Sequence, residues 1–120
     1  MAIPSTTLEF AEVLDPHDTL DYVVDATGLL EAGESILSYT ITPLAEASAL
    51  GLTVLNSGGY SNSLISGNKI RFWVNISVGL RGDVAFNGSG ASLPLEIAIT
   101  TTSMPPRTKQ RTIAIRVAQR

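Results

Sequence analysis

Hydrophobic and polar residues alternate with a period of two along most of this chain, which is the pattern of β-strands with one buried face. The clearest run is NKIRFWVNISV, in which every second residue from Ile70 to Ile76 is apolar. Runs with similar alternation or many β-branched residues occupy residues 8–14, 20–25, 36–42, 51–56, 93–102 and 111–118. Seven or eight short strands at this close spacing predict an all-β fold.

Turn-forming residues separate the apolar runs and define the predicted connections. They occur in the segments DPHD, EAGE, NSGG, SGN, RGD, NGSG and MPPR. Asn87 and Gly88 form a pair that tight hairpin turns prefer, so we expect a hairpin turn there. The segment TPLAEASALG is the helical candidate, opened by Pro43 and ended by Gly51, although a bare loop fits it nearly as well.

These elements predict a single β-sandwich domain of the immunoglobulin-like type over residues 1–120, with residues 1–5 as a flexible N-terminal arm. The strand expected around residues 70–76 contains the adjacent rings of Phe72 and Trp73, one of which would anchor the core. Because neighbouring residues of a strand point to opposite faces, one of these rings lies in the core and the other on the outer face. An outward Trp73 would be a candidate anchor for a protein partner.

Charged residues make up only 16% of the chain, against about 25% in a typical globular domain. A small domain with so few charges is expected to cover part of its surface by contact with other chains. The chain has no cysteine, and therefore no disulfide framework. It also has no apolar run near the roughly 18 residues of a spanning helix, and no secretory signal at its N-terminus, so we expect a soluble protein.

The charges are divided between the two ends of the chain. Residues 1–46 carry nine of the eleven acidic residues and no lysine or arginine, whereas all eight basic residues lie between positions 69 and 120. Two arrangements explain this polarity. Opposite charges on opposite surfaces would favour head-to-tail contact between copies, or the two ends are neighbouring strands that pair their charges within one monomer. The second arrangement is slightly favoured.

The acidic segment around His17 suggests a metal or acid–base site, but its spacing does not support one. Counted from Asp15, the positions that a calcium loop requires to be glycine and glutamate are Leu20 and Ala26. Asp15 and Asp18 instead suit the capping of a turn, and His17, the single histidine, suits a solvated turn position.

Other catalytic motifs are missing from the sequence. The serines lie outside any nucleophile elbow, and the glycine-rich segments NSGGYSNS and NGSGAS lack the lysine of a phosphate-binding loop. We therefore predict a protein that is not an enzyme, with no catalytic, cofactor-binding or metal-binding residue. The basic C-terminal end belongs to a net acidic chain with a pI near 4.9, so we expect neither nucleic acid nor a membrane as a partner.

Recognition on a β-sandwich is expected in its loops, because loops on a rigid scaffold carry most binding residues. The loops at residues 79–91 and 103–107 are the candidate contact surfaces. The string Arg81-Gly82-Asp83 lies in the first of them and is short enough to arise by chance. The candidate interface residues are Tyr60, Trp73, Arg81, Asp83, Phe86, Met104 and Arg107.

An ordered set of turn and strand residues is shared with a known family. The matching residues are Asp15, Pro16, Leu20, Asp21, Tyr22, Asp25, Leu30, Gly33, Glu34 and Ile36, then GLTVL at 51–55 and the C-terminal segment ITTTSMPPRTKQRTIAIRVAQR. In these segments the chain resembles the fibre-tail adaptors of tailed bacteriophages, which are small virion proteins. Residues 78–100 depart from that family, because they are longer and lack its Gly-Gly-x-x-Gly-x-x-Tyr segment.

The resemblance implies a structural protein of the phage virion, assembled in the cytoplasm of the bacterial host. It implies an adaptor that links tail or neck and fibre components by protein–protein docking, in multiple copies of a symmetric assembly. Its partners would be other virion proteins. An alternative within the virion is a capsid decoration or cement protein that stabilises the head. An alternative of another class is a carbohydrate-binding module that uses Trp73 and Tyr60.

Overall fold

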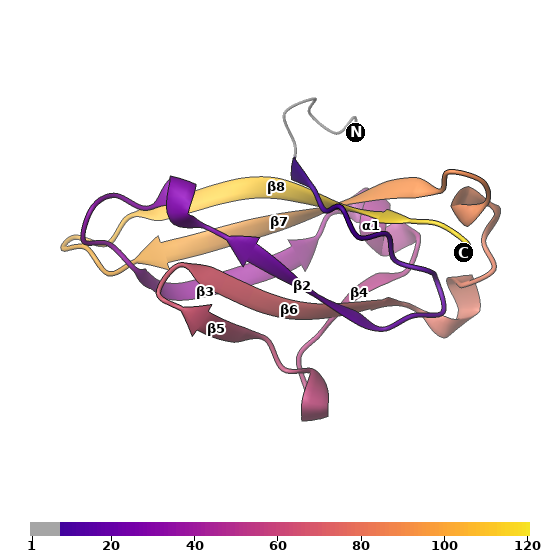
Figure 1. The fold of residues 1–120 in the computed structure, drawn as a ribbon, viewed down its shortest axis with the longest axis horizontal. Coiled ribbons are helices and arrows are strands. Elements are labelled where there is room, and N and C mark those ends of the chain that lie inside the picture. Colours follow the sequence, from indigo (N-terminus) through magenta and orange to yellow (C-terminus); the bar gives the residue numbers. More distant parts are fainter. Residues whose placement is uncertain (1–7) are drawn as a thin grey trace.

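The computed structural model describes residues 8–120, which form two β-sheets packed face to face (Figure 1). The first sheet has the strand order β1-β8-β7-β3 and the second has the order β2-β6-β4, with β5 also paired to β6. The strands are β1 (Leu8–Glu9), β2 (Leu20–Asp25), β3 (Ile36–Pro43), β4 (Leu52–Leu55), β5 (Ser63–Ser66), β6 (Lys69–Ile76), β7 (Ala91–Thr101) and β8 (Thr108–Val117). The N-terminal arm predicted for residues 1–5 lies outside the described residues.

The strand order has the connectivity of an immunoglobulin-like sandwich. The neighbours β2-β6-β4 correspond to strands B-E-D of the constant-type domain, and β3-β7-β8 correspond to strands C-F-G. All pairings among these six strands are antiparallel, whereas the short β1 pairs in parallel with the last strand, β8. The predicted all-β sandwich is therefore confirmed.

The core is formed by the alternating positions of the long strands. In β6, every second residue from Ile70 to Ile76 is fully buried, as the sequence pattern predicts. The opposite sheet contributes the inward residues Leu93, Leu95, Ile97, Ile99, Ile113, Ile115 and Val117. Burial of each such side chain stabilises the fold by roughly 1.5–3 kcal/mol. Phe72 is the core aromatic of its pair, and it packs near Phe10 and Tyr22 with ring centroids 6.1 Å away in both cases.

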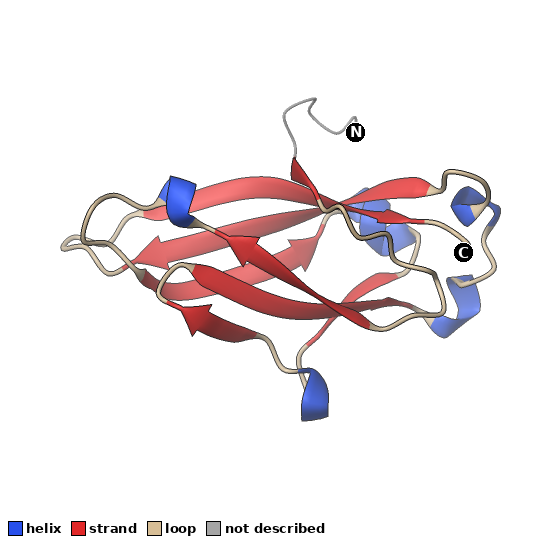
Figure 2. Cartoon of the chain, in the orientation of Figure 1, coloured by secondary structure: helices blue, strands red, loops and turns tan. Residues whose placement is uncertain are grey.

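Short helical turns occupy the connections between strands (Figure 2). The α-helix α1 (Ala45–Ala49) carries the chain from β3 in the first sheet to β4 in the second, and it confirms the predicted helix. It begins two residues after Pro43 because Pro43 is still paired with Leu95 as the last residue of β3. The 3-10 turns are η1 (Thr27–Leu29), η2 (Gly58–Tyr60), η3 (Val78–Leu80) and η4 (Val84–Phe86).

Three sequence expectations need correction. Asn87 and Gly88 do not form a hairpin turn, because they lie in the connection that crosses from β6 in one sheet to β7 in the other. The first predicted strand is only Leu8–Glu9, followed after a break by a single parallel bridge between Leu14 and Val117. The strand β5 was not expected, since its residues SLIS show no clear alternation and all four are exposed.

Candidate docking surfaces

The turn between β7 and β8 presents the most exposed large apolar side chain of the described residues, Met104, with 91% of its surface accessible. The turn is ordered from within. Thr101 Oγ1 accepts a hydrogen bond from the backbone N–H of Arg107 (3.0 Å), and Ser103 Oγ donates to the carbonyl of Pro105 (3.1 Å). The peptide bond between Met104 and Pro105 is cis. Met104 therefore projects from a braced turn.

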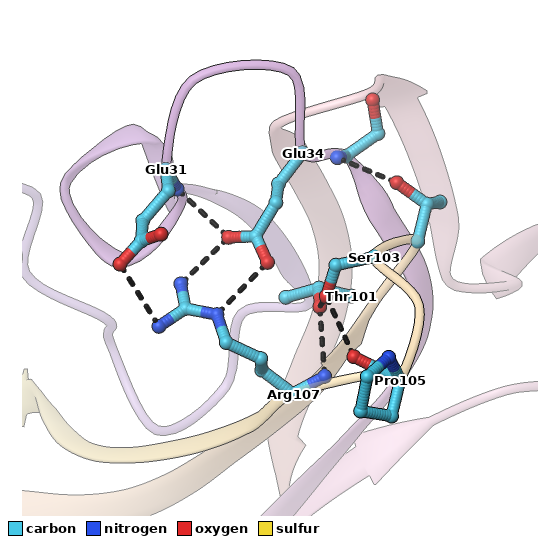
Figure 3. Close-up of polar contacts among 8 residues, drawn as sticks. Glu31, Glu34, Thr101, Ser103, Pro105 and Arg107 are labelled. Carbon is cyan, nitrogen blue, oxygen red and sulfur yellow. Dashed lines mark hydrogen bonds and ion pairs between the residues drawn. The ribbon is translucent and has the colours of Figure 1, made fainter.

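Arg107 ties this turn to the loop between β2 and β3 (Figure 3). Its Nε donates to Glu34 Oε2 at 2.9 Å, one Nη donates to Glu34 Oε1 at 2.6 Å, and the other lies 3.3 Å from Glu31. Two parallel bonds of this kind form the strong bidentate geometry of an arginine–carboxylate pair. The guanidinium lowers the pKa of the Glu34 carboxyl below its ordinary value of 4.5.

The Glu34 side chain is only 6% exposed and that of Arg107 is 32% exposed, so the pair is partly shielded from water and bulk salt. Arg107 was predicted as an interface residue, and its guanidinium is engaged inside the monomer. Its role in this structure is to hold the β7–β8 turn, which carries Met104, to the β2–β3 loop. The partner carboxylate could not be found from the sequence, because Glu34 and Arg107 are 73 positions apart.

The connection between β6 and β7 forms the opposite end of the sandwich (Figure 1). Val78 and Val84 project from it with 77% and 79% of their surfaces exposed, although sequence reasoning did not single them out. Because β7 separates this connection from the β7–β8 turn, the two lie about 35 Å apart at 3.3 Å per residue. The sandwich thus has an exposed apolar tip at each end.

The charged residues predicted in that connection also have internal partners. Asp83 Oδ1 caps η4 by accepting a hydrogen bond from the backbone N–H of Ala85 at 2.9 Å. The Nε of Arg81 donates to the carbonyl of Ile76 at 2.9 Å. Phe86 is fully buried, so the expectation that its side chain contacts a partner is corrected. Its aromatic ring fills the core at this end instead.

Trp73 lies on the outer face of the second sheet, opposite in orientation to the buried Phe72. Its indole meets the ring of Tyr60 from η2, with centroids 5.4 Å apart and planes inclined by 69°. The structure therefore brings together two of the predicted interface residues. The edge-to-face arrangement differs from the flat platform of co-planar rings on which a sugar would stack, so it does not favour the carbohydrate-binding alternative.

The opposite charges of the two chain ends meet within the monomer. The ion pairs join Arg107 to Glu34 and Glu31, Arg116 to Glu9, and Arg71 to Asp21. Three arginines from the basic part of the chain thus neutralise carboxylates from its acidic part. Of the two arrangements that would explain the polarity of the sequence, the structure shows the one in which opposite charges pair within the monomer. They pair because the acidic and basic residues lie on neighbouring strands and loops.

The acidic turn around His17 is built as a turn. Asp15 Oδ1 accepts a hydrogen bond from the backbone N–H of His17 at 2.8 Å, and Asp15 Oδ2 accepts one from the backbone N–H of Arg120 at 2.8 Å. These bonds lower the pKa of the Asp15 carboxyl. The carboxylate thereby fastens the C-terminus to the turn. Within residues 8–120, no group of three or more histidine, aspartate or glutamate side chains is placed to hold a metal ion.

No family model matches this chain, and a search of curated proteins finds no match. Of the helices in the described part of the chain, none is long and apolar enough to cross a membrane.

Proposed function

We propose that this chain is a non-enzymatic structural protein of a tailed bacteriophage virion, an adaptor that links tail or neck and fibre components by docking. The observation that carries the docking role is the pair of exposed apolar tips at opposite ends of one rigid sandwich, Met104 at one end and Val78 with Val84 at the other. Exposed apolar side chains on braced loops suit contacts with other proteins. An exposed apolar tip at each end suits a protein that connects two other proteins.

The virion setting rests on the resemblance of the turn and strand residues to fibre-tail adaptors. Several matching residues have structural roles of the kind that a shared fold would preserve. Glu34 holds Arg107 from the C-terminal match, and Tyr22 packs in the core, where its hydroxyl donates to the carbonyl of Glu12 at 3.2 Å. These contacts support a fold shared with that family. The position of the chain in the virion is determined by a separate measurement.

The test is the number of copies of this chain in purified particles of a phage whose genome encodes it. An adaptor in a symmetric ring is expected at about a dozen copies per particle, whereas a capsid decoration protein is expected at hundreds. Quantitative mass spectrometry of the particles measures the number. Absence of the chain from the particles would refute the proposal, and hundreds of copies would replace the adaptor with the decoration alternative.

The role of the tips is tested with particles that lack the chain and are supplied with variants. Met104→Asp should abolish incorporation of the chain while leaving its unfolding midpoint unchanged, because the side chain is almost fully exposed. Val23→Asp is the matched control, since Val23 is an exposed apolar residue on the outer face of β2 and away from both tips. If Met104→Asp is incorporated as well as Val23→Asp, Met104 is not part of the docking surface.

A further inference from the structure

The strand β3 has an open edge. Among residues 8–120 it pairs with β7 alone. The open stretch is bounded at its start, where the backbone N–H of Ile36 donates to the carbonyl of Gly67 at 2.8 Å, and at its end, where the chain turns into α1 after Pro43. Between these limits the backbone groups that face away from β7 are left without a strand partner. Such groups are a template for an additional strand.

The other sheet edges are shorter or charged. The strand β1 has two residues, and β4 and β5 have four each, separated by residues 56–62. The strand β2 has six residues but carries Asp21 and Asp25. Short edge strands and charges are the devices by which proteins prevent unwanted strand addition. Residues 36–42 of β3 carry no charge and no proline, so this is the unprotected edge of the sandwich.

A cleft of about 620 Å³ runs along that edge, between β3 and β4. It is lined by residues 39–43 of β3, residues 52–54 of β4, and Ser48, Asn56 and Asn62. The lining residues are uncharged and combine hydroxyl and amide groups with aliphatic side chains. A charged segment placed there would lose its hydration without gaining an opposite charge, so the cleft favours an uncharged occupant.

One atom in the cleft lacks a hydrogen-bond partner. Asn62 Oδ1 is buried and accepts no hydrogen bond within the described residues, while the backbone N–H of the same residue donates to Asn56 Oδ1 at 3.0 Å. A buried, unsatisfied acceptor is costly, and in native structures it calls for an explanation. A bound strand explains it if the Asn62 side chain turns toward the cleft on binding, because the strand backbone carries an N–H donor at every residue other than proline.

We propose that the open edge of β3 and the adjoining cleft bind an extended, uncharged segment of another protein, which adds to the first sheet as a further strand beside β3. Residues 39–43 line the cleft, so about five residues of the segment, roughly 16 Å in length, would pair. Its backbone hydrogen-bonds to β3, and the Asn62 side chain turns toward the cleft so that Oδ1 accepts from one of its donors. This surface is separate from the two apolar tips and does not depend on the virion setting.

A second copy of this chain fits the edge less well than a slim segment. The β3 edge of the second copy is bordered by its own residues 56–62, which include Asn56 and Asn62 of the cleft wall. Two edges that are each overhung by the same loop obstruct one another when they approach. A single extended segment meets only one such loop.

Binding is tested by selecting a displayed library of random decapeptides on the folded chain, then measuring affinities by fluorescence anisotropy. The enriched peptides should be poor in charged residues and rich in β-branched residues. Thr40→Lys, which puts a charge on the open edge, should lower the affinity for these peptides at least tenfold. Gln110→Lys is the matched control, because Gln110 lies in the same cross-strand row on β8, two strands away from the edge, and it should change the affinity less than twofold.

Asn62→Leu separates a binding role from a structural one. It removes an unsatisfied acceptor, so the urea midpoint of the free chain should stay the same or rise while the peptides bind at least tenfold more weakly. The proposal is overturned if no peptide is enriched over the starting library, or if the peptides bind the Thr40→Lys and Asn62→Leu variants as tightly as the wild type. It is also overturned if light scattering shows a wild-type dimer that Thr40→Lys dissociates and Gln110→Lys does not, since a second copy would then be the occupant.

Discussion

Gly90 is the position at which the structure makes its sharpest prediction about stability. It has a φ of +77° and lies where the β6–β7 connection meets the end of β8. A Cβ added there would stand 2.0 Å from the carbonyl oxygen of Val117 and 2.6 Å from the Cβ of Ala118. A Cβ cannot lie 2.0 Å from a carbonyl oxygen, so Gly90→Ala requires the backbone of β8 or of the β6–β7 connection to move.

The expected loss has two parts. The left-handed backbone conformation costs a residue with a Cβ roughly 1–2 kcal/mol. Forcing extra volume into a packed site costs typically 1–3 kcal/mol more. Since the backbone of Val117 cannot rotate away as a side chain would, we expect Gly90→Ala to lower the free energy of unfolding by about 3–5 kcal/mol, near the upper end of these sums.

Two glycines provide graded controls. Gly88 has a φ of +64° but open space around its Cβ position, so Gly88→Ala should cost only the conformational part, about 1 kcal/mol. Gly28 also has open space and no positive φ. Gly28→Ala should be neutral or stabilising by up to about 1 kcal/mol, because alanine restricts the unfolded chain.

Urea unfolding followed by the fluorescence of Trp73, the single tryptophan, measures all three variants. With a slope of about 1.5 kcal/mol per molar urea, Gly90→Ala should lower the midpoint by about 2 M or more, and Gly88→Ala by less than about 1 M. If the two midpoints agree within experimental error, the close approach of Gly90 to β8 is refuted, and with it the packing of the β6–β7 connection against the C-terminal strand.

Three further predictions concern the core and the ion pairs. Phe72→Ala, at a fully buried position, should lower the free energy of unfolding by about 3–5 kcal/mol in the same urea assay. Glu34→Gln should destabilise the chain more than Glu46→Gln at pH 7. Because the folded-state pKa of Glu34 is depressed below 4.5, this difference is fully present above pH 4.5 and shrinks as the pH falls toward the folded-state pKa; a difference that grows on acidification would contradict the pairing. Arg116→Ala, in an exposed pair with Glu9, should cost less than about 1 kcal/mol at low salt and almost nothing at 1 M NaCl.

The sequence pattern was sufficient to predict the strands whose inward residues are apolar at every second position, together with the face that each strand buries. Burial alternates without interruption over residues 70–76. Over residues 93–99 the predicted face is buried too, although Pro94 on the other face is also buried. The pattern failed where pairing depends on a neighbour. The exposed β5 exists because it follows the edge of β6, and Asn87 with Gly88 serves a crossing between sheets because the strands before and after it belong to different sheets.

The candidate surfaces were predictable only in part, because exposure and pairing are set by residues distant in the sequence. Loop position was enough to suggest Met104, and strand alternation was enough to place Trp73 outside if Phe72 lay inside. Neither signal shows that Phe86 is buried or that Arg107 is paired. Those outcomes depend on the packing of the β6–β7 connection against the C-terminal segment and on Glu34.

The placement of the charges links the internal stability of the sandwich to the character of its free surfaces. The polarity of the sequence, acidic at one end and basic at the other, is used within the monomer, where arginines of β6, β8 and the β7–β8 turn meet carboxylates of the N-terminal third. The surfaces proposed for contact are themselves uncharged: Met104 and Val84 at the tips, and residues 36–42 at the edge of β3. Contacts made through apolar side chains and backbone hydrogen bonds depend weakly on ionic strength. Any assembly that this chain enters is therefore expected to rest on shape and backbone pairing rather than on electrostatic attraction between copies.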